Sequence, residues 1–227
     1  MSAQSSEASV GAVFFDLFGT LLSLAPLDEA CDQLAPGRGG EIAARWRARQ
    51  LEATWLRTVM DRWANFDVVT RDALAVTLHE LGVEVPPDRD AVTDAFVELP
   101  LADGAAEGLR ALHHDGMATG VLTNASRRTL DAVAARLDVD LGHLVSVDPA
   151  RRFKPHPSVY QLAVDAAALP PERIGFVTAN GWDAAGAGAF GMRVAWLRPS
   201  AVAVLPAVGG PDPTITTWSA IPSLFAD

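Results

Sequence analysis

The chain has 227 residues, enough for one ordinary domain or for a domain that carries an insertion, but too few for two full-size domains. Hydrophobic residues make up 49% and charged residues 20%, so the chain can bury a substantial core and is not disordered as a whole. The formal net charge of −10 disfavours nucleic acid and acidic membrane surfaces as partners.

Cysteine usage and local hydrophobicity indicate the cellular compartment. Cys31 is the only cysteine, so neither an intrachain disulfide nor a multi-cysteine metal site can form, and we expect a cytoplasmic protein. No apolar run approaches the ~20 residues of a membrane-spanning helix. Residues 1–9 are small and polar, and we expect them to be disordered.

Short apolar runs alternate with helical patterns along most of the chain. The runs that predict buried strands are Ala12–Phe15, Ala118–Leu122, Leu144–Val147, Ile174–Val177 and Arg193–Trp196. The helical patterns between them are Ala105–His114, Arg127–Leu137, Ser158–Ala168 and Ala184–Phe190. This alternation is typical of βαβ crossovers, so we predict an α/β fold with a Rossmann-like parallel sheet.

One long stretch, residues 26–101, interrupts the alternation. It is rich in Arg, Glu, Leu and Trp and has no convincing strand pattern. Its longest helical pattern, Glu41–Trp63, places Ile42, Trp46 and Leu56 among apolar positions at helical spacing. We therefore expect residues 26–101 to form a helical cap domain, inserted into a core domain of residues 10–25 and 102–227.

Polar residues follow four of the predicted strands. Asp16–Thr20, Thr123–Asn124, Lys154 and Thr178–Asp183 all lie at strand ends that a parallel sheet would bring to one crevice. There Asp16 could act as a nucleophile, Lys154 could keep it ionised, and Asp183 could activate water. Taken singly, each has a simpler interpretation: Asp16 as a turn residue, Lys154 as a surface lysine, and Asp183 as the cap of a helix beginning at Ala184.

Several stretches carry a family resemblance. They are Phe15–Leu21, Leu122–Asn124, Phe153–Pro157 with Tyr160 beyond it, and Asn180–Ala187. Together they resemble the haloacid dehalogenase superfamily, and within it the L-2-haloacid dehalogenases. The predicted cap agrees, since Pro36–Gly39, Trp46–Glu52 and Thr54–Arg57 are similar to the cap of that family. The resemblance covers nearly the whole chain and fades before Val10 and after about Pro199.

Two positions separate this sequence from the phosphatases that dominate the superfamily. Those enzymes typically carry a second Asp two residues after the nucleophile and bind Mg²⁺ through a further carboxylate. This sequence has Phe18 and Ala179 at the two places. A phosphate ester needs both the acid and the ion, whereas a halide leaves carbon as a stable anion. We therefore expect an enzyme without a metal or other cofactor.

The resemblance implies a two-step hydrolysis of a small 2-haloacid. Asp16 attacks carbon 2 of a short L-2-haloalkanoate and forms an ester, and water activated by Asp183 then releases a D-2-hydroxy acid. Thr20 would hydrogen-bond the nucleophile, and Asn180 would place Asp183 or the water. The implied catalytic residues are Asp16, Thr20, Lys154, Thr178, Asn180 and Asp183.

A second group of residues would bind the substrate and the departing halide. Arg47, with Asn124 and Trp182, would hold the halide. Thr123 and backbone N–H groups near Leu17 and Asn124 would bind the substrate carboxylate. The implied binding residues are Leu17, Arg47, Phe66, Thr123, Asn124 and Trp182, with Phe66 on the apolar wall.

Some departures from the family pattern and some alternatives stay open. The family usually has Tyr at Phe18 and Ala53, and Ser at Thr123 and Thr178, which puts rate and substrate range in doubt. Tyr160 either packs in the core or lies beside the site. Trp46 and Trp55 could pack within the cap or form a subunit interface, and the family habit of dimerising favours the interface of a homodimer. The alternative functions are another hydrolase of the superfamily, acting on a phosphate ester or another C–X bond, and a non-catalytic binding protein.

Overall fold

The computed structural model describes residues 9–84, 90–198, 214–215 and 217–225. A six-stranded parallel sheet forms its centre, in the order β3-β2-β1-β4-β5-β6. Its strands are β1 (Ala12–Phe15), β2 (Ala118–Thr123), β3 (His143–Ser146), β4 (Ile174–Thr178), β5 (Arg193–Leu197) and β6 (Thr214–Ile215). The α/β fold class predicted from the sequence is confirmed. Residues 1–8 of the predicted disordered N-terminus lie outside the described residues.

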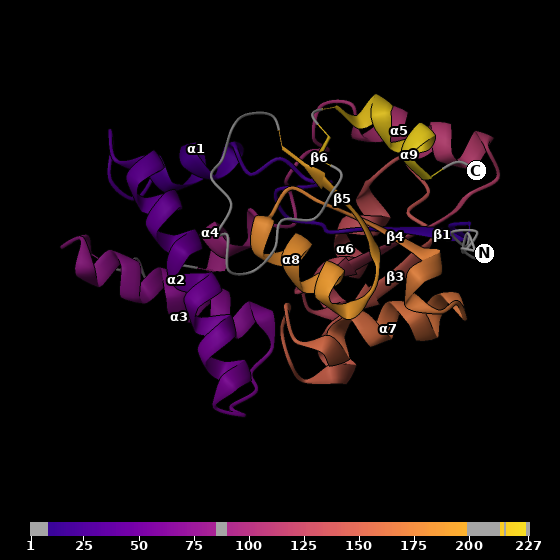
Figure 1. Cartoon of the computed structure of the whole chain (residues 1–227). Coiled ribbons are helices and arrows are strands. Elements are labelled where there is room, and N and C mark those ends of the chain that lie inside the picture. The colour runs from indigo at the N-terminus through magenta and orange to yellow at the C-terminus, as the bar shows by residue number, and fades with distance from the viewer. Residues whose placement is uncertain (1–8, 85–89, 199–213, 216, 226–227) are drawn as a thin grey trace.

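Helices cover both faces of the sheet and extend beyond one edge. They are α1 (Pro26–Asp32), α2 (Gly39–Val59), α3 (Phe66–Glu80), α4 (Asp90–Asp94), α5 (Ala105–His114), α6 (Arg127–Arg136), α7 (Pro157–Ala167), α8 (Gly181–Phe190) and α9 (Ile221–Phe225). Helices α5 and α9 pack together on one face, and α7 and α8 pack together on the other (Figure 1). None of the helices in the described ranges is long and apolar enough to cross a membrane.

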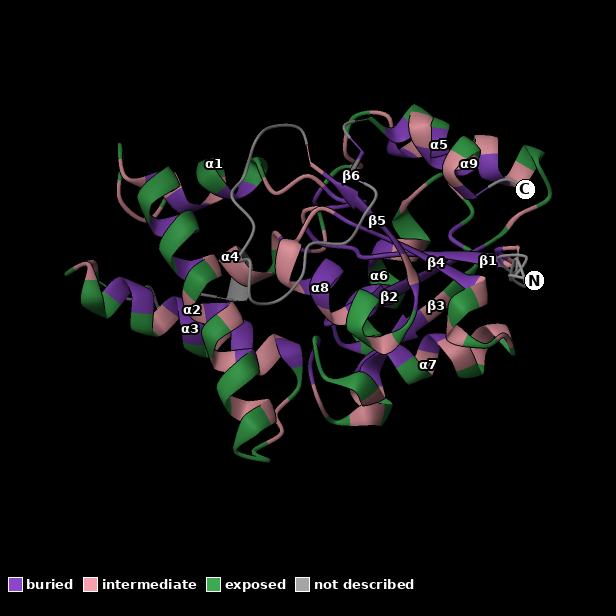
Figure 2. Cartoon of the chain, viewed as in Figure 1, coloured by how far each residue is buried: buried purple, intermediate pink, exposed green. Residues whose placement is uncertain are grey.

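The central strand β1 shows why the strands of this sheet have continuous apolar sequences. All four of its residues are buried, because strands flank it on both sides and helices cover both faces (Figure 2). Phe15 stacks on Trp218 with ring centroids 5.7 Å apart, while Phe14, which points to the opposite face, stacks on His143 at 5.9 Å. Both faces of β1 are therefore filled by aromatic side chains.

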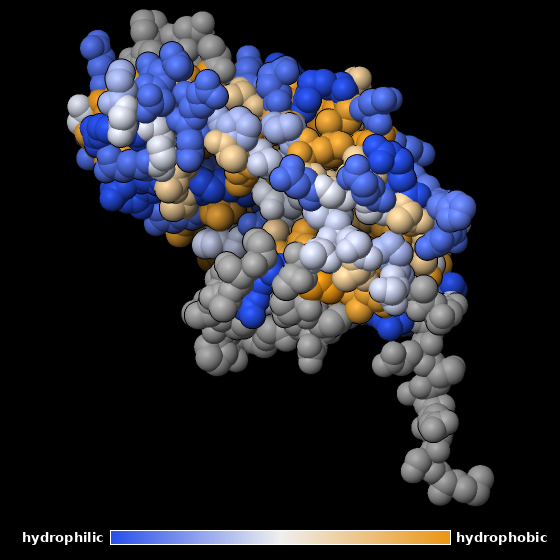
Figure 3. Space-filling view, turned by 90° about the horizontal axis from the view of Figure 1, so that it is seen from above, coloured by the Kyte–Doolittle hydropathy of each residue, from blue (hydrophilic) through white to orange (hydrophobic). Residues whose placement is uncertain are grey.

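Helices α1–α4 lie beyond the carboxyl ends of the central strands (Figure 1). Helix α3 begins at a side-chain cap, in which Asn65 Oδ1 accepts from the Val68 N–H at 3.0 Å. The Thr58 hydroxyl at the end of α2 accepts from the Phe153 N–H at 3.0 Å, and Trp63 stacks on Phe153. Hydrophilic side chains dominate one face of this helical lobe (Figure 3).

Several element boundaries differ from the sequence prediction by one to four residues. Strand β3 lies one residue earlier than predicted, and α2 ends at Val59 rather than Trp63. Helix α8 begins at Gly181 instead of Ala184, so Asp183 lies in its first turn and is not its cap. The simpler interpretation of Asp183 as a helix cap is therefore wrong, because the extended residue before the helix is Asn180. The short strand β6 has no apolar run of its own and was not predicted.

Candidate active site

Asp16 follows directly after β1, at the point where the chain turns away from the sheet. The turn places Gly19 at φ 82°, a conformation that favours glycine, and its N–H donates to the Leu22 carbonyl at 2.9 Å. The turn returns Thr20 to the carboxylate, and the Thr20 hydroxyl donates to Asp16 Oδ2 at 3.0 Å. Asp16 is thereby buried with its carboxylate aimed into a ring of donors.

Lys154 is the only lysine of the chain, and it is fully buried between two carboxylates. Its ammonium donates to Asp16 Oδ1 at 3.0 Å and to Asp183 Oδ2 at 2.9 Å. Burial alone would lower the pKa of Lys154, but the charges of Asp16 and Asp183 outweigh it and raise that pKa above its ordinary value. The lysine therefore stays charged and holds the two carboxylates at one point.

Asp183 is fully buried and is held by a tyrosine as well as by Lys154. The Tyr160 hydroxyl on α7 donates to Asp183 Oδ1 at 2.8 Å. Burial raises the pKa of Asp183 to about 6, against the lowering effect of Lys154. Burial, together with the charge on Asp183, holds the pKa of Tyr160 far above its ordinary value, so the phenol keeps its proton.

A glycine on α8 allows the tyrosine to reach Asp183. A Cβ atom added at Gly186 would lie 2.4 Å from the Tyr160 hydroxyl oxygen and 2.5 Å from Pro155 Cβ. No side chain fits there, so α8 and α7 can approach only at a glycine. The sequence left the place of Tyr160 open, and its contact with Asp183 could be found only from this approach of two helices.

Two polar residues behind Asp16 fix its other oxygen. The Asn180 amide donates to Asp16 Oδ2 at 2.7 Å, and the Thr20 hydroxyl accepts from the Ala179 N–H at 2.9 Å. Thr178, predicted near the carboxylates, instead accepts from the Asn180 N–H at 3.1 Å. It contacts neither carboxylate through a hydrogen bond in the described chain, and its hydroxyl serves to orient Asn180.

Arg47 lies on α2 and is half-buried. Burial lowers its pKa, and the charge of Asp16 acts in the opposite direction, so the two groups sense each other. No ion pair joins them, however, and no other carboxylate among the described residues pairs with Arg47. Its Nη1 donates to Gln50 Oε1 at 2.5 Å. The Arg47 guanidinium thus feels the charge of Asp16 without an ion pair to it, and its hydrogen bond is to the neutral Gln50 amide.

The remaining predicted binding residues lie around this centre. Asn124 Oδ1 accepts from the Lys154 N–H at 2.9 Å and ties the end of β2 to the lysine loop. The Thr123 hydroxyl accepts from the Ala125 N–H at 3.1 Å, which leaves its proton available. The backbone N–H groups of Leu17 and Asn124 have no acceptor among the described residues.

Aromatic side chains form the apolar part of the site. Phe66 at the start of α3 stacks on Phe18 with ring centroids 6.0 Å apart, and it also contacts Phe153. Trp182 on α8 makes an edge contact with Trp55 on α2, at 5.8 Å between centroids. The pairing of Trp55 with Trp182 joins residues far apart in the sequence, and no local pattern could have predicted it.

Trp46 corrects an expectation drawn from the family resemblance. It was predicted at a subunit interface together with Trp55, but it is 1% exposed. Its ring packs edge-on against Phe96, and its Nε1 donates to the Thr70 carbonyl at 2.9 Å. The interface interpretation is wrong for Trp46, which fixes α2 to α3 from the inside.

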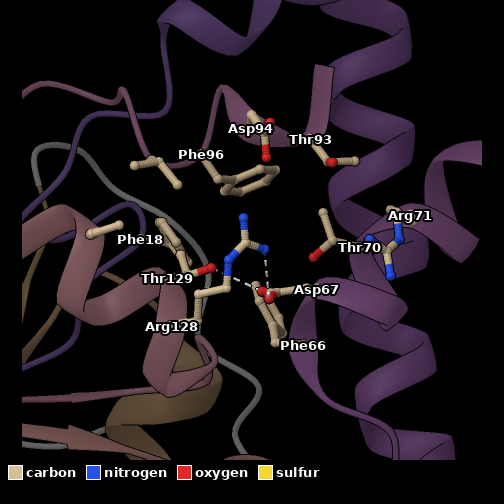
Figure 4. Close-up of a pocket in the computed structure, with 12 residues that line it drawn as sticks. Phe18, Phe66, Asp67, Thr70, Arg71, Thr93, Asp94, Phe96, Arg128 and Thr129 are labelled. Carbon is tan, nitrogen blue, oxygen red and sulfur yellow. Dashed lines mark hydrogen bonds and ion pairs between the residues drawn. The ribbon is translucent and has the colours of Figure 1, made fainter. Parts of the chain in front are cut away.

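A cavity of about 160 Å³ opens on the far side of Phe18 and Phe66 (Figure 4). Residues of α3, α4 and α6 line it, and the lining combines aromatic rings such as Phe96 with charged groups such as Asp94 and Arg128. Asp67 crosses from α3 to α6 and accepts from the hydroxyls of Ser126 and Thr129, each at 2.9 Å. These bonds anchor the start of α3 over the strand ends and so hold Phe66 beside the nucleophile turn.

Comparisons with known proteins agree with this geometry. The family model of haloacid dehalogenase-like hydrolases matches residues 10–191. The chain belongs to this family of hydrolases. The family match includes β1 with Asp16, the Lys154 loop and the start of α8, so it takes in every residue of the buried carboxylate and lysine cluster.

Three individual relatives in this family are named as dehalogenases. The (S)-2-haloacid dehalogenase of Pseudomonas sp. (strain YL) is 37% identical over 95% of this hydrolase and 94% of its own length. Haloacetate dehalogenase H-2 of Moraxella sp. (strain B) is 34% identical over 96% and 98%. The structure of L-2-haloacid dehalogenase from Xanthobacter autotrophicus with chloropropionic acid covalently bound matches with a TM-score of 0.86 and 31% identity, covering 95% of this chain and 98% of that one.

Proposed function

We propose that this hydrolase converts short L-2-haloalkanoic acids and water into D-2-hydroxy acids and halide, through an ester on Asp16. The observation that carries the proposal is the buried Lys154 ammonium, bonded to both Asp16 and Asp183. Arg47, which has no ion pair with Asp16, is close enough to feel its charge. The similarity to (S)-2-haloacid dehalogenases, and to one with chloropropionic acid covalently bound, supports it.

The first step is displacement of the halogen at carbon 2. An oxygen of Asp16 forms the new C–O bond while the C–X bond breaks and the halide leaves with the electron pair. The halide must leave from the side opposite the attacking oxygen, so the carbon is inverted. We assign Arg47 as the group that receives the anion, because it feels the charge of Asp16 and has no carboxylate partner of its own among the described residues.

The second step is hydrolysis of the ester. Asp16 Oδ1 has one hydrogen-bond donor, whereas Oδ2 has two, from Thr20 and Asn180. If Oδ1 is alkylated, Oδ2 becomes the ester carbonyl oxygen, and these two donors stabilise the oxyanion that forms when water attacks. Asp183 accepts a proton of the water as the water oxygen attacks Cγ. The Oδ1–Cγ bond then breaks, and this proton passes to Oδ1, so that the hydroxy acid leaves and the Asp16 carboxyl group is restored.

The substrate carboxylate binds beside the nucleophile. The free backbone N–H groups of Leu17 and Asn124 and the proton of the Thr123 hydroxyl supply three donors at the strand ends. Phe66 and Trp182 enclose the alkyl group from the helical side. Three neutral donors and an apolar wall suit a short acid better than a large one.

An assay of halide release on both enantiomers of 2-chloropropionate tests the proposal. Release from the L form, with D-lactate as product and with no response to Mg²⁺ or EDTA, is the expected result, and the Asp16→Asn variant serves as the blank. Phosphate-ester hydrolysis that depends on Mg²⁺, without halide release, would establish the phosphatase alternative instead. Release from the D form alone would overturn the proposed stereochemistry.

The acid limb of the pH profile should depend on Tyr160. Asp183 must be ionised to take a proton from water in the ester-hydrolysis step, so kcat should fall as the pH drops below the Asp183 pKa of about 6. The Tyr160 hydroxyl favours the ionised form, so Tyr160→Phe should raise that pKa and move the limb to higher pH by roughly one unit. A Tyr160→Phe profile with an unmoved acid limb would contradict the assignment of Asp183 as the base.

The remaining expectations extend this proposal. The division into a core (10–25 and 102–227) and a helical cap (26–101) would let the cap carry Arg47 over the nucleophile. A homodimer is supported by an exposed apolar group at the end of α2, formed by Trp55, Leu56, Val59 and Met60. Sedimentation of the purified chain should show twice the mass of the chain, and a single chain mass would contradict the homodimer. The cytoplasmic location and the absence of a metal or cofactor stay predictions.

A further inference from the structure

We propose that Gln50 is a positioning residue, which holds Arg47 toward the nucleophile through a neutral hydrogen bond and so leaves the guanidinium charge free for the expelled halide. Thr70 accepts a hydrogen bond from the Gln50 amide, and Gln50 and Thr70 together are called the clamp. This inference rests on the proposed function, because it concerns the group that receives the halide.

The hydrogen bonds of Gln50 fix its amide in one orientation. Gln50 is 0% exposed and lies one turn after Arg47 on α2. Arginine can only donate, so the amide oxygen must face it, and Oε1 accepts from Arg47 Nη1 at 2.5 Å. The amide nitrogen donates in turn to the Thr70 hydroxyl on α3 at 2.6 Å.

The far end of the clamp is itself anchored. The Thr70 carbonyl accepts from the indole of Trp46 at 2.9 Å, and both Gln50 and Trp46 project from α2 onto this one residue. Thr70 lies at the wall of the cavity beside Phe66 (Figure 4). The position of the Arg47 head is therefore set by the packing of α2 against α3.

The charges along α2 show why a neutral partner matters. Arg45 and Arg49 both pair with Glu80, and Arg49 also pairs with Glu52, so the arginines on either side of Arg47 are compensated. Arg47 alone of these three is held by an amide, in an environment that lowers its pKa by burial. A poorly solvated guanidinium without a counter-ion binds an anion more strongly than a paired one. Glutamate in place of Gln50 would keep the shape of the side chain, but its carboxylate would be a permanent counter-ion for Arg47.

The consequence should depend on the leaving group. Chloride carries its charge on a smaller ion and leaves carbon less readily than bromide, so its departure needs the guanidinium more. A misplaced or compensated Arg47 should therefore slow reaction of the chloro acid more than that of the bromo acid. A general loss of folding would lower both rates equally.

The test compares 2-chloropropionate with 2-bromopropionate at about pH 8, where a glutamate is ionised. Gln50→Glu introduces the compensating charge, and Gln50→Leu removes the clamp without adding charge. Thr54→Val is the matched control, since Thr54 is also fully buried on α2 but its hydroxyl donates only to the Leu51 carbonyl. Bromide titration followed by intrinsic tryptophan fluorescence gives a readout that does not require turnover.

Both Gln50 variants should lower kcat for the chloro acid by up to ~10²-fold, as misplacement of a catalytic contact by about 1 Å can do, with a smaller loss for the bromo acid and weaker bromide binding. Thr54→Val should leave the ratio of the two rates and bromide binding unchanged. Equal losses on both substrates with unchanged bromide binding would overturn the inference. If the wild-type chain released no halide at all, the proposed function would fail, and the bromide titration alone would decide the role of Gln50.

Discussion

Replacing Lys154 with methionine is expected to abolish halide release and to lower the free energy of unfolding by about 3–5 kcal/mol near neutral pH. The wild-type ammonium bonds to Asp16 and Asp183, and all three groups are buried. Methionine fills a similar volume but carries no charge, so two carboxylates would remain in one buried site without a cation. Removing one partner of such a cluster costs much more than the cluster contributes as a whole.

The loss in the free energy of unfolding caused by Lys154→Met should depend on pH. Without Lys154 the pKa of Asp183, already raised by burial to about 6, should rise further. A carboxyl whose folded-state pKa is raised destabilises the fold increasingly as the pH rises through that pKa. Urea unfolding should therefore show a larger loss at about pH 8 than at about pH 5. An equal loss at both pH values would show that the lysine acts through packing alone.

Replacing Asp16 with asparagine is expected to lower halide release by at least ~10⁴-fold while the protein stays folded. The amide has no nucleophilic oxygen of comparable strength, and no other described carboxylate is placed to face Arg47. Lys154 keeps its bond to Asp183, so no buried carboxylate loses its cation. Circular dichroism and unfolding curves close to those of the wild-type chain should accompany the loss.

Asp148→Asn is the matched control for Asp16→Asn. Asp148 is half-buried, and its Oδ2 accepts from the Arg127 N–H at 2.8 Å, while no hydrogen bond or ion pair among the described residues joins it to the lysine cluster. An amide oxygen can still accept that bond, so halide release should stay within a few-fold of the wild-type rate. Measurable turnover by Asp16→Asn at the wild-type level would remove Asp16 from the mechanism.

Residues local in sequence were predictable from simple patterns. The strand β1 is an apolar run because the sheet is covered on both faces, and Asp16 follows it because the chain must turn at the edge. The same reasoning placed Lys154 and Asp183 at the same edge, and in the structure the Lys154 ammonium donates to both Asp16 and Asp183. Strand ends of a parallel sheet meet in space, so their polar residues could be grouped without coordinates.

Contacts between helices could not be predicted in this way. Gln50 and Thr70 meet only because α2 packs on α3, and a polar residue on an amphipathic helix reads as solvent-exposed until its partner is known. Trp46 was placed at an interface from the family resemblance, although its indole donates to the Thr70 carbonyl inside the helical lobe. Tyr160 reaches Asp183 because Gly186 lets two helices approach, which no periodicity records.

The chemical basis of the account is that Asp16 itself becomes bonded to the substrate carbon. A single-turnover reaction in H₂¹⁸O, with enzyme in excess over L-2-chloropropionate, measures this directly by mass spectrometry of the peptide that contains Asp16 and of the released lactate. Because water attacks the carbonyl carbon of Asp16, the isotope should appear in the Asp16 carboxylate, and the lactate of the first turnover should be unlabelled. Labelled lactate together with an unlabelled Asp16 peptide would show that water displaces the halide itself and would contradict the account.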